Sequence, residues 1–223
     1  MGEHCTTEKL ARIRKFSDLT LACEGQTFNV HKSICCYHSP EAETSSLTIN
    51  FDLDSVLRLI QFLYTGDYTF YPDPALNQIS SCPLPTPPAP DAKLDVGHEI
   101  SLIDRLLCHS RLNTVADYYD LPQLATLSTE KAQRILSAEW SVEAFCSLLE
   151  KTIGQTNNKP FLDMLATKAG EHAIELSGNS QIFQDGPIAE QIAPQALRTI
   201  LREAKLNNGK IPDPSTSKRG RFR

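Results

Sequence analysis

The stretch that decides the fold is FSDLTLACEGQTFNVHK, from Phe16 to Lys32. Apolar residues alternate with polar or smaller ones on both sides of Glu24-Gly25. A period of two is typical of strands, and a short link with a glycine between two such runs favours a hairpin. The stretch therefore predicts a β-hairpin. Its core-facing residues are predicted to be Leu19, Leu21, Phe28 and Val30.

A second informative stretch is LIQFLYTGDY, from Leu59 to Tyr68. It lies in a segment whose apolar residues recur at helical spacing, which predicts a helix over Ser55–Thr65 with Asp54 as its cap and Gly66 as its end. Its core stripe is predicted to be Val56, Leu59, Ile60 and Leu63. Between hairpin and helix we expect a short helix near Lys32–His38 and a strand at Ser46–Phe51.

Helical spacing returns in LNTVADYYDLPQLATLSTEKAQRIL, from Leu112 to Leu136. Val115 and Tyr119 share one apolar stripe, and Leu121-Pro122 predicts a break followed by a new helix, because proline suits a first turn. Further helical stripes follow from Val142 to Leu201.

In this order and spacing, the three stretches resemble the BTB/POZ domain, and the chain is most similar to fungal-type members with one such domain and a helical C-terminal extension. The resemblance implies an α/β (α+β) fold, in which a small sheet flanked by helices precedes a mostly helical C-terminal region. It also implies a module that makes protein–protein contacts and carries no chemistry of its own.

Proline marks the organisation of the chain, because seven of the 14 prolines lie between Pro72 and Pro90. Such a run holds neither a helix nor a central strand, and it predicts a connector. We therefore expect an N-terminal segment (1–15), a BTB/POZ domain (16–136) interrupted by a proline-rich insertion (72–97), a helical region (137–206) and a basic disordered tail (207–223).

The chain departs from the family between HKSICCYHSP and EAETSSLTIN, where about one helix of the usual domain is absent after Pro40. In the family that helix belongs to the dimer interface. Either this is a degenerate member with impaired dimerisation, or the gene model lost an exon segment. We favour the second explanation, because the flanking sequence on both sides stays close to the family pattern.

The resemblance also implies interaction residues. In the family, an aspartate at the start of the hairpin and a basic residue after its second strand face each other in a charged pocket of the dimer, and here they match Asp18 and Lys32. The alternative is that Asp18 caps the strand entry and Lys32 merely opens the next helix. We further expect partner contacts from exposed residues near Ser33–Pro40 and at the corner that holds Tyr64 and Tyr68.

No motif predicts catalysis, a cofactor or a metal. The sequence has no phosphate-binding glycine loop and no nucleophile elbow, and Leu102 occupies the place of the second histidine in the start of a zinc-protease pattern at His98. Cys35-Cys36, near His31 and His38, is the one Cys/His cluster, but adjacent cysteines on a helix point about 100° apart. We predict no enzyme and no small-molecule substrate.

Charge and cysteine usage bear on partners. The net charge is −5, although SKRGRFR at the C-terminus is basic, so we do not expect a nucleic-acid-binding globular surface. Seven cysteines without a C-x-x-C pair favour a reducing compartment, the cytoplasm or the nucleus. MGEHCT fits an acylation pattern, but its glutamate is disfavoured there, so we predict no membrane attachment.

The predicted partners are therefore proteins, through self-association or a cullin scaffold. By resemblance, the chain would be a substrate adaptor for a cullin-based ubiquitin ligase, with the helices of residues 138–206 holding the substrate. The alternatives are a nuclear, transcription-related oligomerisation domain with the basic tail as import signal, and a degenerate remnant.

Overall fold

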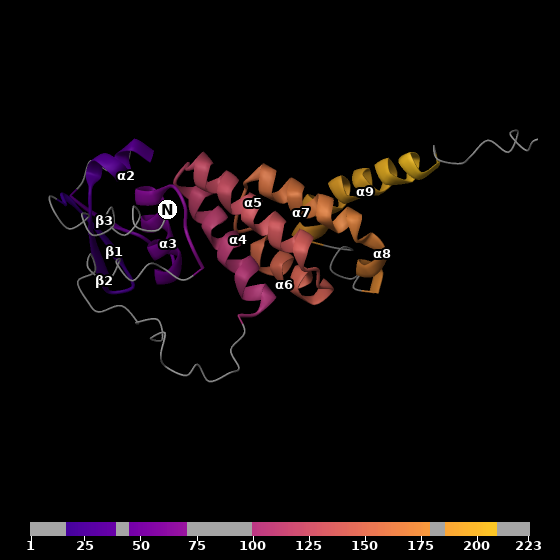
Figure 1. Cartoon of the computed structure of the whole chain (residues 1–223), viewed down its shortest axis with the longest axis horizontal. Helices are drawn as coiled ribbons and strands as arrows, with labels where there is room; N and C mark the ends of the chain where they lie inside the picture. The colour runs from indigo at the N-terminus through magenta and orange to yellow at the C-terminus, as the bar shows by residue number, and fades with distance from the viewer. Residues whose placement is uncertain (1–16, 39–44, 71–99, 179–185, 209–223) are drawn as a thin grey trace, which may run out of the picture. The chain divides into compact units, whose positions relative to one another are not determined.

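The computed structural model describes residues 17–38, 45–70, 100–178 and 186–208 (Figure 1). The chain divides into two compact units, Met1–Phe161 (unit 1) and Leu162–Arg223 (unit 2). The N-terminal segment, the residues just after Pro40, the proline-rich insertion and the basic tail, for each of which the sequence carries a prediction, lie outside the described residues. The domain boundaries proposed from the sequence remain predictions.

The predicted hairpin is confirmed. Strands β1 (Leu19–Cys23) and β2 (Gln26–Val30) pair antiparallel, with Leu19 opposite Val30 and Cys23 opposite Gln26. The turn needs two left-handed residues, Glu24 at φ 47° and Gly25 at φ 78°. Glycine adopts this region without steric cost, which explains its place in the turn.

The third strand, β3 (Ser46–Thr48), pairs parallel to β1 and completes a sheet of order β2-β1-β3. It is shorter than the predicted Ser46–Phe51. The last backbone hydrogen bond to β1 runs from the Ile49 amide to the Ala22 carbonyl at 2.8 Å, and the chain then leaves the sheet. Beyond this point the thiol of Cys23 donates to the Phe51 carbonyl at 3.1 Å. Between β2 and β3 lies the predicted short helix, α2 (Lys32–His38).

Helix α3 (Leu53–Thr65) covers the sheet. Its cap is Asp52 rather than the predicted Asp54: the Asp52 carboxylate accepts from the Ser55 amide at 3.0 Å and from the Ser55 hydroxyl at 2.7 Å. Asp54 instead lies in the first turn, where its charge suits the helix dipole. The predicted end is confirmed, because Gly66 is left-handed at φ 77° and its amide donates to the Phe62 carbonyl.

The core of unit 1 includes an apolar cluster between the sheet and α3 and another between α3 and the helices that follow. Most of the core residues predicted from the sequence are buried, and these are Leu19, Leu21, Phe28, Val30, Val56, Leu59, Ile60 and Val115. Leu63 and Tyr119 are half-buried and pack against the second cluster.

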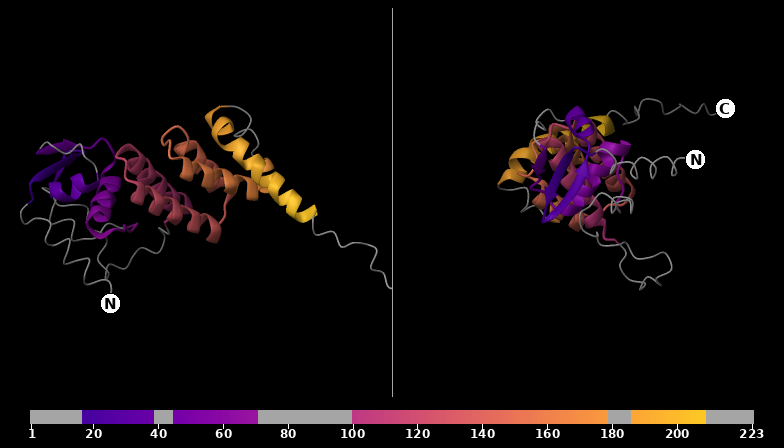
Figure 2. Two further views of the ribbon diagram at one scale, coloured as in Figure 1. Left: turned by 90° about the horizontal axis from the view of Figure 1, so that it is seen from above. Right: turned by 90° about the vertical axis from the view of Figure 1, so that its left-hand side faces the viewer.

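Three helices complete unit 1: α4 (Leu102–Tyr118), α5 (Pro122–Ala138) and α6 (Val142–Thr152). Helices α4 and α5 lie side by side, and α4 also contacts α3 and α6 (Figures 1 and 2). The predicted break is confirmed, since α5 begins at Pro122, which has no N–H to leave unpaired. The predicted α/β class, a small sheet with many helices, is therefore correct.

Polar side chains of α4, two of them buried, bind the neighbouring elements. Asn113 is fully buried, and its amide nitrogen donates to the Ala125 carbonyl at 3.2 Å and to the Ser128 hydroxyl at 3.1 Å. The Ser110 hydroxyl pairs with Thr152 at 2.6 Å, and the Asp117 carboxylate accepts from the Asn157 amide at 2.8 Å. These contacts join α4 to α5, to α6 and to the loop after α6.

Unit 2 contains most of α7 (Lys159–Glu171), all of α8 (Ala173–Leu176) and α9 (Pro187–Asn208). Helices α7 and α9 lie close together at Gly170, where a Cβ atom would lie 2.7 Å from the Thr199 Cβ and 2.8 Å from the Ala196 carbonyl oxygen. Only a residue without a side chain fits this crossing.

Candidate interaction surface

The junction between β2 and α2 brings together two of the residues predicted to mediate association. Asp18 is exposed at the entry to β1, and its carboxylate accepts a hydrogen bond from the Lys32 backbone N–H at 2.7 Å. Lys32 is the first residue of α2, whose first amides have no partner within the helix. The contact is thus made by the backbone of Lys32, which agrees with the alternative that Asp18 acts as a cap and Lys32 opens the helix. The role of both side chains in a charged pocket of a dimer remains a prediction.

Tyr64, from α3, binds the residue just before Lys32. Its hydroxyl lies 2.9 Å from the His31 backbone nitrogen, which donates to it, and 2.9 Å from His31 Nδ1. The Tyr64 side chain is half-buried against the sheet cluster, and burial raises the pKa of its phenol. Tyr64 therefore holds the β2–α2 junction against α3, and its role in binding a partner remains a prediction.

Tyr68 lies in the core. Only 1% of it is exposed, and its hydroxyl pairs with Nδ1 of the buried His109 of α4 at 2.7 Å. Burial, followed by the charges of Lys131 and Arg58, lowers the pKa of His109 to about 4. The expectation of an exposed corner at Tyr68 is therefore wrong for this side chain, because it is buried against His109 of α4 and Lys131 of α5.

Lys131 of α5 (Pro122–Ala138) contacts Tyr68 and its neighbour Asp67. Its ammonium group pairs with the Asp67 carboxylate, donates to the Tyr68 carbonyl at 2.5 Å and lies 4.1 Å from the centroid of the Tyr68 ring. On α3, the buried Arg58 donates to the Phe70 carbonyl at 2.5 Å. These cations fix residues 67–70 between α3 and α5.

A feature that sequence reasoning missed is an aromatic patch of three residues, Phe51, Tyr118 and Tyr119. Tyr118 is 72% exposed, and its ring stands edge-on to Phe51 at 5.5 Å and to Tyr119 at 4.9 Å between centroids. Phe51 also lines a shallow hollow of about 410 Å³ at the ends of β1 and β3. The two adjacent tyrosines in VADYYDL could have predicted this exposed ring, since two adjacent residues of a helix cannot both face the core.

Three of the described cysteines are buried. Burial raises the pKa of the Cys23, Cys108 and Cys146 thiols, which disfavours the nucleophilic thiolate. Among the described residues, no group of His, Cys, Asp and Glu is arranged to hold a metal ion. Nor does any helix in the described ranges combine the length and apolar character needed to cross a membrane.

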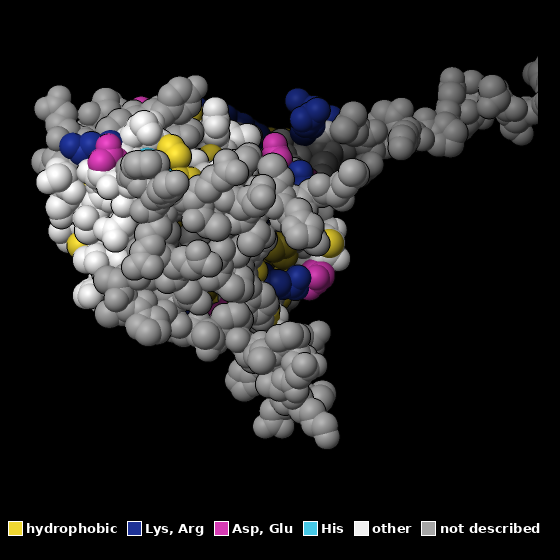
Figure 3. Space-filling view, turned by 60° about the vertical axis from the view of Figure 1, so that its left-hand side comes forward, with side chains coloured by type: hydrophobic (Ala, Val, Ile, Leu, Met, Phe, Trp, Pro, Cys, Tyr) yellow, Lys and Arg dark blue, Asp and Glu magenta, His cyan; other side chains and the backbone are white. Residues whose placement is uncertain are grey.

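Basic and acidic side chains of the described residues occur close together. In Figure 3, lysine and arginine side chains lie beside acidic ones at several places on the face in view. Ion pairs in unit 1 include Arg105 with Glu139 and Arg134 with Glu130.

Comparison with known families agrees with this arrangement. Residues 7–80, which include the hairpin, α2, β3 and α3, match the model of the BTB/POZ domain. The chain contains a BTB/POZ domain. No curated protein matches the chain. BTB/POZ domains are protein–protein interaction modules and are generally non-catalytic, so the predicted family and the general function are confirmed at this level.

Proposed function

We propose that the chain is a non-catalytic substrate adaptor, whose BTB/POZ unit binds a cullin scaffold while the helices of residues 138–206 hold a protein for ubiquitin transfer. An adaptor needs two separate docking surfaces, one for each partner. Its place of action is the cytoplasm or the nucleus, as the cysteine usage predicts.

The observation that supports this proposal is the distribution of exposed apolar side chains. Among the described residues, the large exposed hydrophobic side chains fall in both compact units. Tyr118 lies in unit 1, and Ile174, Leu197, Ile200 and Leu201 lie in unit 2. Contiguous exposed apolar groups are typical of surfaces that bind other proteins, so Tyr118 supports the proposal only together with Phe51 and Tyr119 of its patch.

In unit 1, the aromatic patch is the proposed contact for the scaffold. Tyr118 presents a large ring that Phe51 and Tyr119 hold in a fixed orientation. Tyrosine side chains are enriched among the residues that contribute most to binding energy, since they bury a large area with little loss of conformational entropy. The patch would thus act as an anchor that is ordered before the partner arrives.

The proposal is tested by capture of a cullin scaffold from a lysate with the tagged full chain and with Tyr118→Ala. We expect the wild-type chain to capture a cullin and the variant to lose at least ten-fold of the signal. The matched control is Arg134→Ala, since Arg134 is also an exposed helical residue of unit 1. Absence of cullin from the wild-type capture, with well-folded protein, would overturn the proposal.

The second candidate is self-association through Asp18 and Lys32, as a nuclear oligomerisation module with the basic tail as import signal. It is favoured by the exposure of Asp18 at the open end of the hairpin, directly beside the start of α2. Sedimentation of the wild-type chain tests it. A dimer that Asp18→Lys dissociates and Asp18→Lys with Lys32→Asp restores would support it, and a monomeric wild-type chain would exclude it.

A further inference from the structure

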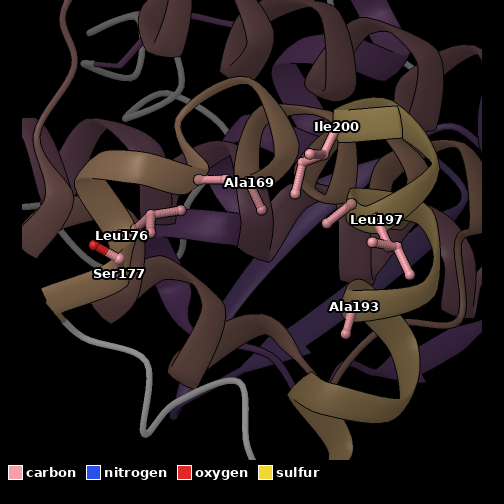
Figure 4. A pocket seen from close by; sticks show the side chains of 8 residues that line it. Ala169, Leu176, Ser177, Ala193, Leu197 and Ile200 are labelled. Atoms are coloured by element: carbon pink, nitrogen blue, oxygen red, sulfur yellow. The ribbon is translucent and has the colours of Figure 1, made fainter. Parts of the chain in front are cut away.

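Unit 2 holds an apolar groove of about 250 Å³ (the α9 groove; Figure 4). Ala169 and Leu176, from the helices before α9, stand on one side of it. The opposite wall comes from α9 and consists of Ala193, Ala196, Leu197 and Ile200. These four follow each other at i, i+3, i+4 and i+7, the spacing of residues that surround one side chain of a facing helix in a coiled coil. The wall is therefore shaped to accept a side chain from a second helix that runs along α9.

The α9 wall is part of a longer apolar stripe (the α9 stripe). At about 100° per residue, five apolar residues lie within an arc of about 100° on α9, and they are Ala193, Leu197, Ile200, Leu201 and Ala204. Leu197 and Leu201 are 55% and 52% exposed, and Ile200 is 37% exposed. The helix is continuous through Pro194, so the stripe is not interrupted. Contiguous exposed apolar residues of this kind mark a surface that another protein covers.

Charge on α9 is arranged unevenly round the stripe. Arg198 and Arg202 lie more than about 110° round the helix from the middle of the stripe, so they face away from a helix that covers it. Glu190 and Lys205 lie nearer, at about 35° and 95°, on the flank away from α7. Both side chains are exposed, and no ion pair between described residues includes either of them. One acid thus stands near the beginning of the stripe and one base near its end.

The stripe is complementary to itself when two copies of α9 run antiparallel. With Leu197 of one copy level with Ile200 of the other, Ala193 is level with Ala204. Ile200 then enters the α9 wall of the groove, and Leu197 enters the next set of four residues, which consists of Leu197, Ile200, Leu201 and Ala204. The short side chains of Ala193 and Ala204 let the two helices approach. A two-fold axis repeats each contact, so that one patch serves both copies.

The same arrangement pairs the charges. A two-fold axis between antiparallel helices brings the same flank of each together, so Glu190 of one copy comes within reach of Lys205 of the other, twice. In a parallel pair these two residues would stay about 22 Å apart along the helix axis. Many apolar helices fit the stripe, but α9 itself supplies both the matching side chains and the matching charges. The occupant that these observations favour is therefore a second copy of the chain.

We propose that two copies of the chain associate through antiparallel α9 helices, with Ile200 of each copy in the α9 groove of the other and Glu190 paired with Lys205 across the contact. The inference goes beyond the adaptor function and does not rest on it, because it concerns contacts between copies of this chain alone. The contact spans about three helical turns, which is small beside a standard interface. We therefore expect weak association, with a dissociation constant on the order of 10–100 µM.

Sedimentation equilibrium of the purified full chain tests the proposal, at chain concentrations up to about ten times that constant. We expect a monomer–dimer equilibrium for the wild type. Leu197→Glu sets a charge in the covered stripe and should weaken association at least ten-fold. Because Leu197 is exposed, this variant should melt like the wild type. Arg202→Glu is the matched control, since it changes an exposed residue on the opposite side of α9, and it should leave the dissociation constant unchanged.

A charge exchange tests the direction of the helices. Glu190→Lys and Lys205→Glu should each weaken association about five-fold at low salt, because each sets like charges together. The double variant should restore the wild-type dissociation constant. These differences should shrink at high salt, because both side chains are exposed. The exchange keeps the test valid if Leu197→Glu alters the fold.

Three results would overturn the inference: a monomer over the whole concentration range, a dimer that Leu197→Glu leaves intact, or a double charge variant that associates no better than the single ones. Asp18→Lys, measured alongside, separates this contact from self-association through the hairpin. It should leave the α9 dimer unchanged. A dimer that Asp18→Lys dissociates and the α9 variants do not would use the hairpin and exclude the α9 contact.

Discussion

The Tyr64 hydroxyl lies 2.9 Å from the backbone nitrogen of His31 and 2.9 Å from its ring nitrogen Nδ1. Asp18 binds the next amide along the chain, that of Lys32, at 2.7 Å. Two consecutive amides at the β2–α2 junction are therefore held by side chains from two other parts of unit 1. This links the hairpin, the short helix and α3, the elements with which the BTB/POZ match coincides.

Removing the Tyr64 hydroxyl should destabilise unit 1. Tyr64→Phe keeps the ring in its place but takes away the acceptor of the His31 amide, so we expect the free energy of unfolding to fall by about 1–2 kcal/mol. Chemical denaturation of the full chain checks this. Tyr118→Phe is the matched control, because the exposed Tyr118 hydroxyl should contribute nothing measurable. An equal effect of both variants would contradict the assigned role of Tyr64.

The stability of the fold should decrease in acid because of His109. Its pKa is about 4 when folded, against an ordinary value near 6.5. Between these values the unfolded chain takes up a proton that the folded chain does not, so the free energy of unfolding falls as the pH drops from about 6.5 to about 4. Linkage gives a loss on the order of 3 kcal/mol, which levels off at lower pH.

The measurement for this prediction is the free energy of unfolding against pH for the wild type and for His109→Gln, which carries no titratable ring. The difference in stability between the two proteins should shrink as the pH falls from 7 to 4, because only the wild type pays for protonation. Parallel curves over this range would show that His109 titrates normally and is not buried as described.

Asn113 should be among the costliest polar residues to replace. Its fully buried amide contacts the Ala125 carbonyl and the Ser128 hydroxyl. Asn113→Ala leaves these groups buried with fewer partners, and we expect a loss of about 2–3 kcal/mol by thermal or chemical denaturation. Arg111→Ala, on the exposed face of the same helix, should change stability by less than about 0.5 kcal/mol. A neutral Asn113→Ala variant would refute the assignment of this network.

Gly170→Ala should loosen unit 2, because the new Cβ would lie 2.7 Å from that of Thr199. A clash of this kind costs about 1–3 kcal/mol, measured as faster hydrogen exchange of α9 amides. Gly178→Ala is the control, since nothing lies within 4 Å of its added Cβ. If both variants exchanged like the wild type, α7 and α9 would not cross at Gly170.

Local pattern was enough to predict the hairpin, the end of α3 at Gly66 and the restart at Pro122, because each depends on backbone rules that a few residues carry. The cap of α3 was misassigned by two residues, because Asp52 and Asp54 both suit a helix start and only their positions in space separate them. The length of β3 was set by pairing with β1, which the sequence of β3 alone does not encode.

The buried polar contacts around Tyr68 could not be predicted from the sequence for a different reason. Tyr68 looked like part of an exposed corner, yet it lies beneath Lys131, which is 63 residues away in the chain. Its burial depends on partners that meet only after folding. The spacing of Ser110 and Asn113 on one face of α4 was visible in the sequence, and it could have indicated that this face carries buried polar groups.

The most direct test of the adaptor account is calorimetric titration of the purified full chain with the purified N-terminal domain of a cullin scaffold. The account predicts stoichiometric binding to the wild type, affinity reduced at least ten-fold by Tyr118→Ala, and unchanged affinity for Ala193→Trp, whose substitution lies in unit 2. Absence of binding to the folded wild-type chain, or equal affinity for Tyr118→Ala, would contradict it.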